Sequence, residues 1–184
     1  MIADRVTEHA RNVVEHKIVS GPYHYLACLR HLRDLERQRT VEFPYYWDTK
    51  ASNRILEYAE NLTIAEGNYP KKVKLIEEQA FDLGSRFGWK KLNGFRRFRR
   101  SYESKARQNG KTFENGIMGT YIGGFSGYNY GKLFTVATKK RQARLAWEEM
   151  SKFISSDSDL NELFDIKDYK STILCKVTNS TIEA

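Results

Sequence analysis

The tripeptide Gly110-Lys111-Thr112 constrains the fold of this chain more than any other feature of its sequence. It matches the second half of a phosphate-binding loop, in which backbone N–H groups surround the phosphates, a lysine reaches the outer phosphates and a hydroxyl ligates Mg²⁺. The first half is irregular, because Lys105 stands where the standard loop has glycine. The motif has meaning only if a strand precedes it and a helix follows it.

The sequence around this loop alternates between strand-like and helix-like segments. We predict strands over 99–105, 133–137 and 172–177, and helices over 111–125 and 139–154. This order is typical of a parallel sheet with crossover helices. The segment 99–105 is unusually polar for a central strand. The segment 111–125 contains four glycines, so its helix either packs very close to a neighbour or ends early.

The sequence pattern of the N-terminal half predicts mainly helices. Apolar residues at helical spacing predict four helices, over residues 1–20, 23–39, 49–62 and 72–87. An aromatic connector over 42–47 separates the second helix from the third, and Asn93-Gly94 marks a turn. The predicted fold class is therefore α/β, a parallel sheet of the P-loop NTPase type preceded by an N-terminal helical segment; that the sheet is truncated is implied only by the family resemblance given below.

Net charge and cysteine content indicate which classes of partner and which cellular compartment suit this chain. The formal net charge is +8 and the sequence pI is about 9.4, which favours a polyanionic partner such as a nucleotide or nucleic acid. Two cysteines cannot form a disulfide framework and suit a reducing cytoplasm. The N-terminus has no apolar signal region, and no apolar run approaches the roughly 20 residues of a membrane span. We expect a cytoplasmic protein without a membrane segment.

Two further groups of residues have both a functional and a structural interpretation. His24, Cys28 and His31 have a spacing that suits metal ligation on one helix, but no fourth ligand is close in sequence, so packing is the favoured explanation. Phenylalanine and arginine alternate over residues 95–100. This pattern fits nucleic-acid binding, and equally a strand edge with two buried phenylalanines.

The order of these motifs resembles the N-terminal part of the large terminase subunit of tailed double-stranded DNA phages. That family's phosphate loop often lacks the first glycine, and residues 106–112 fit its form. Four other segments are similar to the family in the same order: 27–35, 43–46, 78–81 followed by 87–90, and 137–144. The resemblance covers nearly the whole chain. It implies a helical lead-in over residues 1–70 and a partial P-loop ATPase domain over 71–184.

The resemblance assigns a role to each residue of the loop. Lys111 would neutralise the β- and γ-phosphates, Arg107 would approach the γ-phosphate, and Thr112 would ligate Mg²⁺. Gln108, Asn109 and Gly110 would complete the phosphate cradle, and Gln79 would read the edge of the adenine. These residue types suit phosphoryl transfer, which depends mainly on positioning and on charge stabilisation. The implied cofactors are ATP and Mg²⁺.

The carboxylates that hydrolysis requires are missing from the pattern. The family places Asp-Glu after an apolar strand, and this dipeptide does not occur in the 184 residues. In the family the acidic strand follows shortly after the strand expected at 172–177, and the nuclease carboxylates come later. We therefore expect an N-terminal fragment that contains the nucleotide loop and is hydrolytically incompetent.

The leading functional hypothesis is the ATP-binding part of a motor that moves double-stranded DNA into a procapsid. The resemblance implies a portal, a small terminase subunit and a homo-oligomeric ring as partners. The alternative is a non-enzymatic, basic nucleic-acid-binding module. A small-molecule P-loop kinase is a weaker third hypothesis, because the sequence shows no arginine-rich lid.

Overall fold

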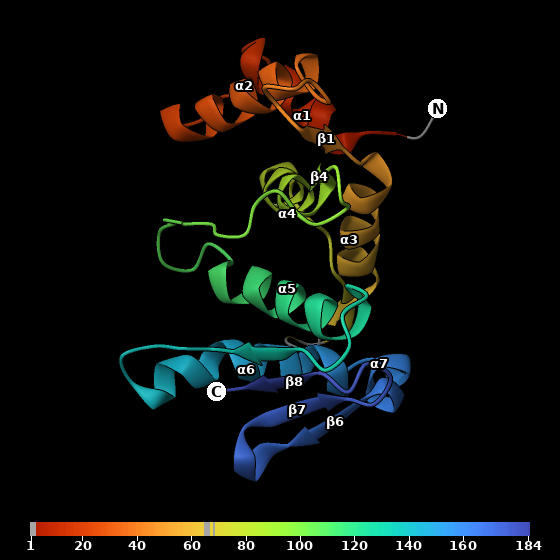
Figure 1. Ribbon diagram of the computed structural model, residues 1–184. Helices are drawn as coiled ribbons and strands as arrows, with labels where there is room; N and C mark the ends of the chain where they lie inside the picture. The colour runs from red at the N-terminus through yellow and green to blue at the C-terminus, as the bar shows by residue number, and fades with distance from the viewer. Residues whose placement is uncertain (1–2, 65–66, 68) are drawn as a thin grey trace. The chain divides into compact units, whose positions relative to one another are not determined.

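The computed structural model describes residues 3–64, 67 and 69–184 (Figure 1). The chain forms two compact units, Met1–Tyr58 with Lys74–Glu103 and Ala59–Val73 with Ser104–Ala184. Helices and strands occur together, and one sheet has four strands, so the predicted α/β class is confirmed. The predicted division into a helical lead-in over 1–70 and a partial ATPase domain over 71–184 stays a prediction.

The four helices predicted for the N-terminal half are present and shorter than the apolar spacing indicated. They are α1 (Arg5–Val14), α2 (Pro22–Glu36), α3 (Thr49–Asn61) and α4 (Glu77–Gly88). Asp4 caps α1 by accepting a hydrogen bond from the Thr7 N–H at 3.0 Å, which fixes where the helix begins. The predicted fourth helix begins later than residue 72, because Lys71–Lys72 forms strand β3, paired antiparallel with β2 (Thr63–Ile64).

In the first unit, α1 packs against both α2 and α4. A short antiparallel ribbon of β1 (Tyr45–Trp47) and β4 (Trp89–Lys91) places Trp47 opposite Trp89. The aromatic connector is therefore partly a strand. Its function is packing, since Phe43 is buried and contacts the Trp89 ring edge to face.

A buried polar chain ties the start of α1 to α2 and β4. The Thr7 hydroxyl donates to Asp4, and His31 Nε2 lies 2.9 Å from that hydroxyl. The Trp89 indole N–H donates to His31 Nδ1 at 3.0 Å. Both ring nitrogens of His31 are thus engaged, and burial lowers its pKa to about 4, so this histidine is neutral and structural.

The basic stretch 95–100 is largely built into the first unit. The Arg97 guanidinium donates to the Asp34 carboxylate at 2.5 Å, and only 16% of the Arg97 side chain is exposed. Its charge also lies over the rings of Phe43, Tyr45, Trp89 and Phe98. An isolated bridge between Lys90 and Arg96 continues the ribbon. The densest basic segment thus has a structural explanation at its centre.

The second unit contains a four-stranded sheet with the order β5-β8-β7-β6. Its strands are β5 (Lys132–Phe134), β6 (Phe164–Lys167), β7 (Thr172–Cys175) and β8 (Thr181–Glu183). Only β5 and β8 are parallel, while β6, β7 and β8 are antiparallel neighbours. The sheet is therefore mixed rather than wholly parallel, because a tight connection between β6 and β7 makes a hairpin that the sequence reading missed.

Three helices belong to this unit: α5 (Lys111–Phe125), α6 (Lys140–Ser155) and the short α7 (Ser158–Leu163). Helix α5 packs against α6, β5 and β8. A Cβ atom at Gly119 would lie 2.4 Å from Met150 Sδ, and one at Gly116 would lie 2.9 Å from Phe153. Of the two alternatives for this glycine-rich segment, close packing is the one observed, and the helix runs its full length.

The predicted strand over 99–105 is wrong. The backbone there is irregular and has no ladder partners among the described residues, and Tyr102 is 93% exposed. The physical reason is the polarity of the segment, which supplies no apolar face to bury in a sheet. The phosphate-loop sequence therefore follows an irregular segment in this structure.

The contrast between the half-buried Arg97 and the exposed Arg99 gives a test of the ion pair between Arg97 and Asp34. Replacing Arg97 by Met leaves the buried Asp34 carboxylate with one fewer cation, and we expect a loss of about 3 kcal/mol in the free energy of unfolding. The exposed Arg99 is the matched control, and Arg99→Met should change it by less than about 0.5 kcal/mol. Urea unfolding followed by circular dichroism measures both. Equal effects would contradict the structural role of Arg97.

Candidate nucleotide-binding site

The phosphate-loop sequence leads directly into the first turn of α5. Gly110 is the N-cap residue and has φ +75°, a left-handed conformation that glycine adopts without strain. Gln108 is also left-handed, with φ +64°. Helix α5 then begins at Lys111, so the positive end of its dipole and its first backbone N–H groups lie at Gly110-Lys111-Thr112. The helix expected after the loop is present, whereas the strand expected before it is absent from the described residues.

The Lys111 ammonium is turned back onto its own loop, where it donates to the backbone carbonyl of Lys105. Lys105 in turn donates to the Glu114 carboxylate, with 2.7 Å between Nζ and Oε1. Glu114 is fully buried on the first turn of α5, and 13% of the Lys105 side chain is exposed. The lysine that replaces the standard glycine therefore has a structural partner within the loop's own unit.

Sequence reasoning missed Glu114. Its only signal was position, because it lies three residues after Lys111 on the predicted helix and nine residues after Lys105. A carboxylate in the first turn of a helix is normally read as a favourable interaction with the dipole. Its complete burial, with Lys105 as counter-ion, depends on how the loop folds over α5.

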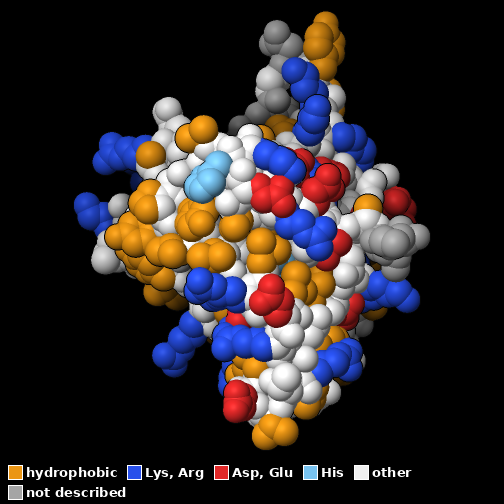
Figure 2. Space-filling model, turned by 90° about the horizontal axis from the view of Figure 1, so that it is seen from above, with side chains coloured by type: hydrophobic (Ala, Val, Ile, Leu, Met, Phe, Trp, Pro, Cys, Tyr) orange, Lys and Arg blue, Asp and Glu red, His pale blue; other side chains and the backbone are white. Residues whose placement is uncertain are grey.

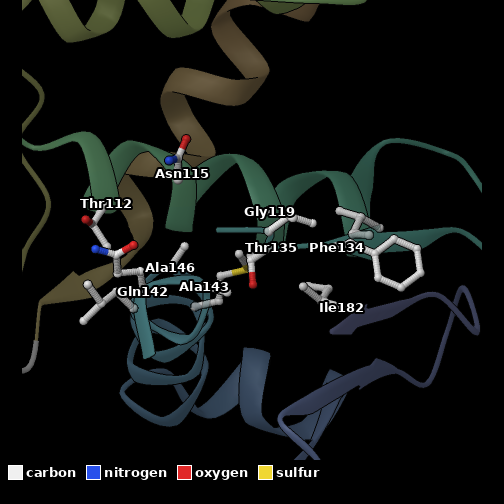
Figure 3. A pocket seen from close by; sticks show the side chains of 13 residues that line it. Thr112, Asn115, Gly119, Phe134, Thr135, Gln142, Ala143, Ala146 and Ile182 are labelled. Atoms are coloured by element: carbon white, nitrogen blue, oxygen red, sulfur yellow. The ribbon is translucent and has the colours of Figure 1, made fainter. Parts of the chain in front are cut away.

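Thr112 is exposed on α5 and lines a pocket of about 430 Å³ within the second unit (Figure 3). Asn115 and Gly119 of α5, Thr135 after β5 and Gln142 of α6 also line this pocket. Figure 3 places Thr112 and Gln142 at the same end of it. The pocket thus has a polar end beside the loop, while Met150 and Ile182 contribute apolar surface.

The remaining predicted residues lie in two places. Arg107, Gln108 and Asn109 are exposed on the loop before Gly110. Gln79 belongs to the other compact unit, near the start of α4. Its Oε1 accepts from the Ile76 backbone N–H at 3.2 Å, which caps the helix. Gln79 therefore already has a local structural role, whatever else it contacts.

The loop residues fit a phosphate group and a hard cation. The left-handed glycine and the helix start aim backbone donors outward, and Lys111 and Arg107 supply positive charge. The exposed hydroxyl of Thr112 is an oxygen ligand of the kind Mg²⁺ prefers. The residue types present in the loop are therefore suited to hold the phosphates and the metal ion of a bound nucleotide.

A protein-family model matches this chain. Residues 77–181 match the family model described as "Terminase large subunit, ATPase domain". That match spans more than half of the chain. The chain belongs to this terminase family. No match was found among curated protein sequences.

The terminase chain is also similar to a solved structure, the large terminase of bacteriophage HK97. The two share 16% sequence identity with a TM-score of 0.61 over 72% of this chain, so the likeness concerns the fold. The aligned part is 26% of the HK97 chain. The terminase chain therefore spans about a quarter of the length of that relative. Among the described residues, no helix is long and apolar enough to cross a membrane.

The buried ion pair of the loop can be tested by a double-mutant cycle. Replacing Lys105 by Met leaves the Glu114 carboxylate buried with weaker compensation, and we expect a loss of about 3–5 kcal/mol in the free energy of unfolding. The double variant Lys105→Met/Glu114→Gln removes that charge and should recover most of the loss. Urea unfolding of the parent, Lys105→Met, Glu114→Gln and the double variant measures the coupling. Additive losses would show that the two side chains do not interact.

Proposed function

We propose that this chain is the ATP-binding portion of a phage large terminase subunit, which powers movement of double-stranded DNA into a procapsid. The observation that carries the proposal is the left-handed Gly110 opening α5 with Lys111 and Thr112, in a chain of the terminase ATPase family. Double-stranded DNA, the portal and the small terminase subunit are the proposed partners. A homo-oligomeric ring in the host cytoplasm is the proposed working form.

Each loop residue has a role that its chemistry supports. Lys111 would neutralise the β- and γ-phosphates, and Arg107 would counter the charge that develops on the γ-phosphate. Gln108, Asn109 and Gly110 would present backbone donors to the phosphates. Thr112 would ligate Mg²⁺, which supplies charge neutralisation when bound. Lys111 must leave the Lys105 carbonyl to reach a phosphate.

We also propose that the 184-residue chain hydrolyses ATP slowly. Orienting and activating the attacking water requires a carboxylate or an equivalent group, and Asp-Glu is absent from these residues. Glu114, the acidic residue closest to Lys111 in the first turn, is committed to the buried pair with Lys105. Binding and turnover are therefore separable properties of this chain.

Lys111→Ala tests the binding half of the proposal. Loss of a charged contact to phosphate should weaken ATP–Mg²⁺ binding roughly 10- to 100-fold, measured by isothermal titration calorimetry. The exposed Lys140, the first residue of α6, gives the matched control, and Lys140→Ala should bind ATP as the parent does. Equal affinity of the parent and the Lys111→Ala variant would refute the loop as the nucleotide site.

Turnover is measured on the same proteins by phosphate release. The parent and the Lys111→Ala variant should both release little phosphate above background. Robust turnover by the parent that Lys111→Ala abolishes would show that a water-activating group exists within these residues. That outcome would overturn the proposal of slow hydrolysis and would leave the proposal of ATP binding standing.

Adenine recognition by Gln79 is a separate proposal with its own variant. Gln79→Glu keeps an acceptor for the Ile76 N–H and so keeps the cap of α4, but it removes the amide donor. We expect roughly tenfold weaker ATP binding with unchanged thermal stability. GTP binding, measured in parallel, should change much less. An unchanged ratio of ATP to GTP affinity would exclude Gln79 from base recognition.

Nucleic-acid binding without nucleotide is the second candidate, favoured by one observation. A pocket of about 330 Å³ in the first unit is lined by Arg30, Arg100, Phe98 and the exposed Tyr102, a mixture suited to phosphates and stacked bases. Against it, Lys and Arg are interspersed with Asp and Glu on the face seen in Figure 2. Steeply salt-dependent DNA binding, unaffected by ATP and by Lys111→Ala, would favour this candidate.

A further inference from the structure

Helices α1 and α2 pack against each other in the first unit (Figure 1), and two histidines and a cysteine converge between them. His9 comes from α1, and His24 and Cys28 come from successive turns of α2. One ligand atom from each residue lies within 4.8 Å of the other two. His9 Nε2 and His24 Nε2 are 2.9 Å apart. His9 and Cys28 are buried, and His24 is half-buried, so the group is reachable from one side.

The structure changes which residues form this group. The sequence spacing suggested His24, Cys28 and His31 on one helix, with packing as the favoured explanation. His31 is excluded, because both of its ring nitrogens are engaged by Thr7 and Trp89. His9, fifteen residues before His24, takes its place from another helix. Helix packing thus supplies a third ligand that sequence spacing did not indicate.

We propose that His9, His24 and Cys28 bind a divalent transition-metal ion of borderline softness, with Zn²⁺ as the first choice. Two imidazoles and a thiolate are ligands that Zn²⁺ shares with Co²⁺, and three protein ligands leave a fourth position for water or a carboxylate. The ligands sit on two packed helices, so a bound ion would cross-link α1 and α2. This inference is independent of the proposed nucleotide function.

The short distance between the two imidazoles fits this assignment. Without metal, one Nε2 donates its hydrogen to the other across 2.9 Å. With metal, both Nε2 lone pairs point at the ion and the ring hydrogens move to Nδ1. Zn–N bonds of about 2.0–2.1 Å in a tetrahedral arrangement separate two such nitrogens by about 3.4 Å. An increase of about half an ångström in this distance, together with a rotation of the rings that turns both Nε2 atoms toward one point, would convert the pair into a ligand pair.

The surrounding charges favour a cation. Burial lowers the pKa of His9 and the neighbouring His24 lowers it further, while Glu77, Glu78 and Asp82 of α4 act in the opposite direction. Asp82 and Glu78 also raise the pKa of the Cys28 thiol, although burial is the larger cause. A divalent ion with one thiolate adds a single net positive charge, which these carboxylates would stabilise.

Cys28 is unreactive without a metal. Burial raises the pKa of its thiol to about 12, so the sulfur is protonated near neutral pH. Coordination forms a metal–sulfur bond and breaks the S–H bond, and the proton leaves to the buffer. No oxidant or reductant is required. Binding should therefore release about one proton for the thiolate formed.

Titration of the reduced, chelator-treated 184-residue chain with Co²⁺ alone tests the proposal. Thiolate coordination gives a sulfur-to-cobalt charge-transfer band in the near ultraviolet together with visible bands of tetrahedral Co²⁺. We expect saturation at one Co²⁺ per chain and displacement by Zn²⁺. Zn²⁺ should also raise the melting temperature of the parent, because it binds the folded state.

Variants locate the ion and guard against misfolding. Cys28→Ser should abolish the charge-transfer band, and the half-buried His24→Asn should weaken Co²⁺ binding by at least about 100-fold. The control variants are Cys175→Ser, at the other buried thiol, and His16→Asn, at an exposed histidine whose left-handed φ of 58° asparagine tolerates. Both controls should bind Co²⁺ as the parent does.

Two results would overturn the proposal. The first is a parent chain with native far-ultraviolet circular dichroism and no charge-transfer band at millimolar Co²⁺. The second is a Co²⁺ affinity of the His24→Asn variant equal to that of the parent, or a band that disappears in Cys175→Ser. Either result would leave the two histidines as a hydrogen-bonded packing pair. Because His24 is half-buried, His24→Asn keeps the test decisive even if the buried Cys28→Ser does not fold.

Discussion

The second unit depends on how closely α5 approaches its neighbours. Gly116 and Gly119 let the helix backbone lie directly against Phe153 and Met150 of α6, at distances that a Cβ atom would not allow. Glycine weakens an isolated helix by about 1 kcal/mol per residue, so this helix depends on its contacts. Those contacts fix the position of the first turn of α5, where Gly110, Lys111 and Thr112 lie.

Buried charge pairs organise both units and account for part of the basic composition. Arg97 pairs with Asp34 in the first unit, and Lys105 pairs with Glu114 in the second. Each pair places a carboxylate out of reach of water and holds it with a cation from an irregular segment. Such pairs specify one arrangement of the chain, because separating them leaves a buried charge. Positive charge in this protein is therefore an unreliable guide to phosphate contacts.

Sequence reasoning predicted elements where the pattern was periodic and strong. The apolar stripes found α1, α2, α3, α4 and α6, and the phosphate-loop motif Gly110-Lys111-Thr112 located α5. The shortest elements, β6, β8 and α7 among them, were missed, because short segments carry little periodicity. A strand was predicted at 99–105, where the polar chain has no ladder. The sequence spacing grouped His24 and Cys28 with His31 and favoured packing as their role; it could not indicate His9, which reaches them through helix packing.

The sequence alone determined the α/β class, the phosphate-loop motif and the resemblance to terminases, since these depend on local spacing and on residue order. Tertiary structure decided what the individual side chains do. Lys105, which looked like a flaw in the motif, is the counter-ion of a buried glutamate, and Arg97 packs among aromatic rings. Such partners are distant in sequence or hidden by burial, and contacts of that kind exist only after the chain has folded.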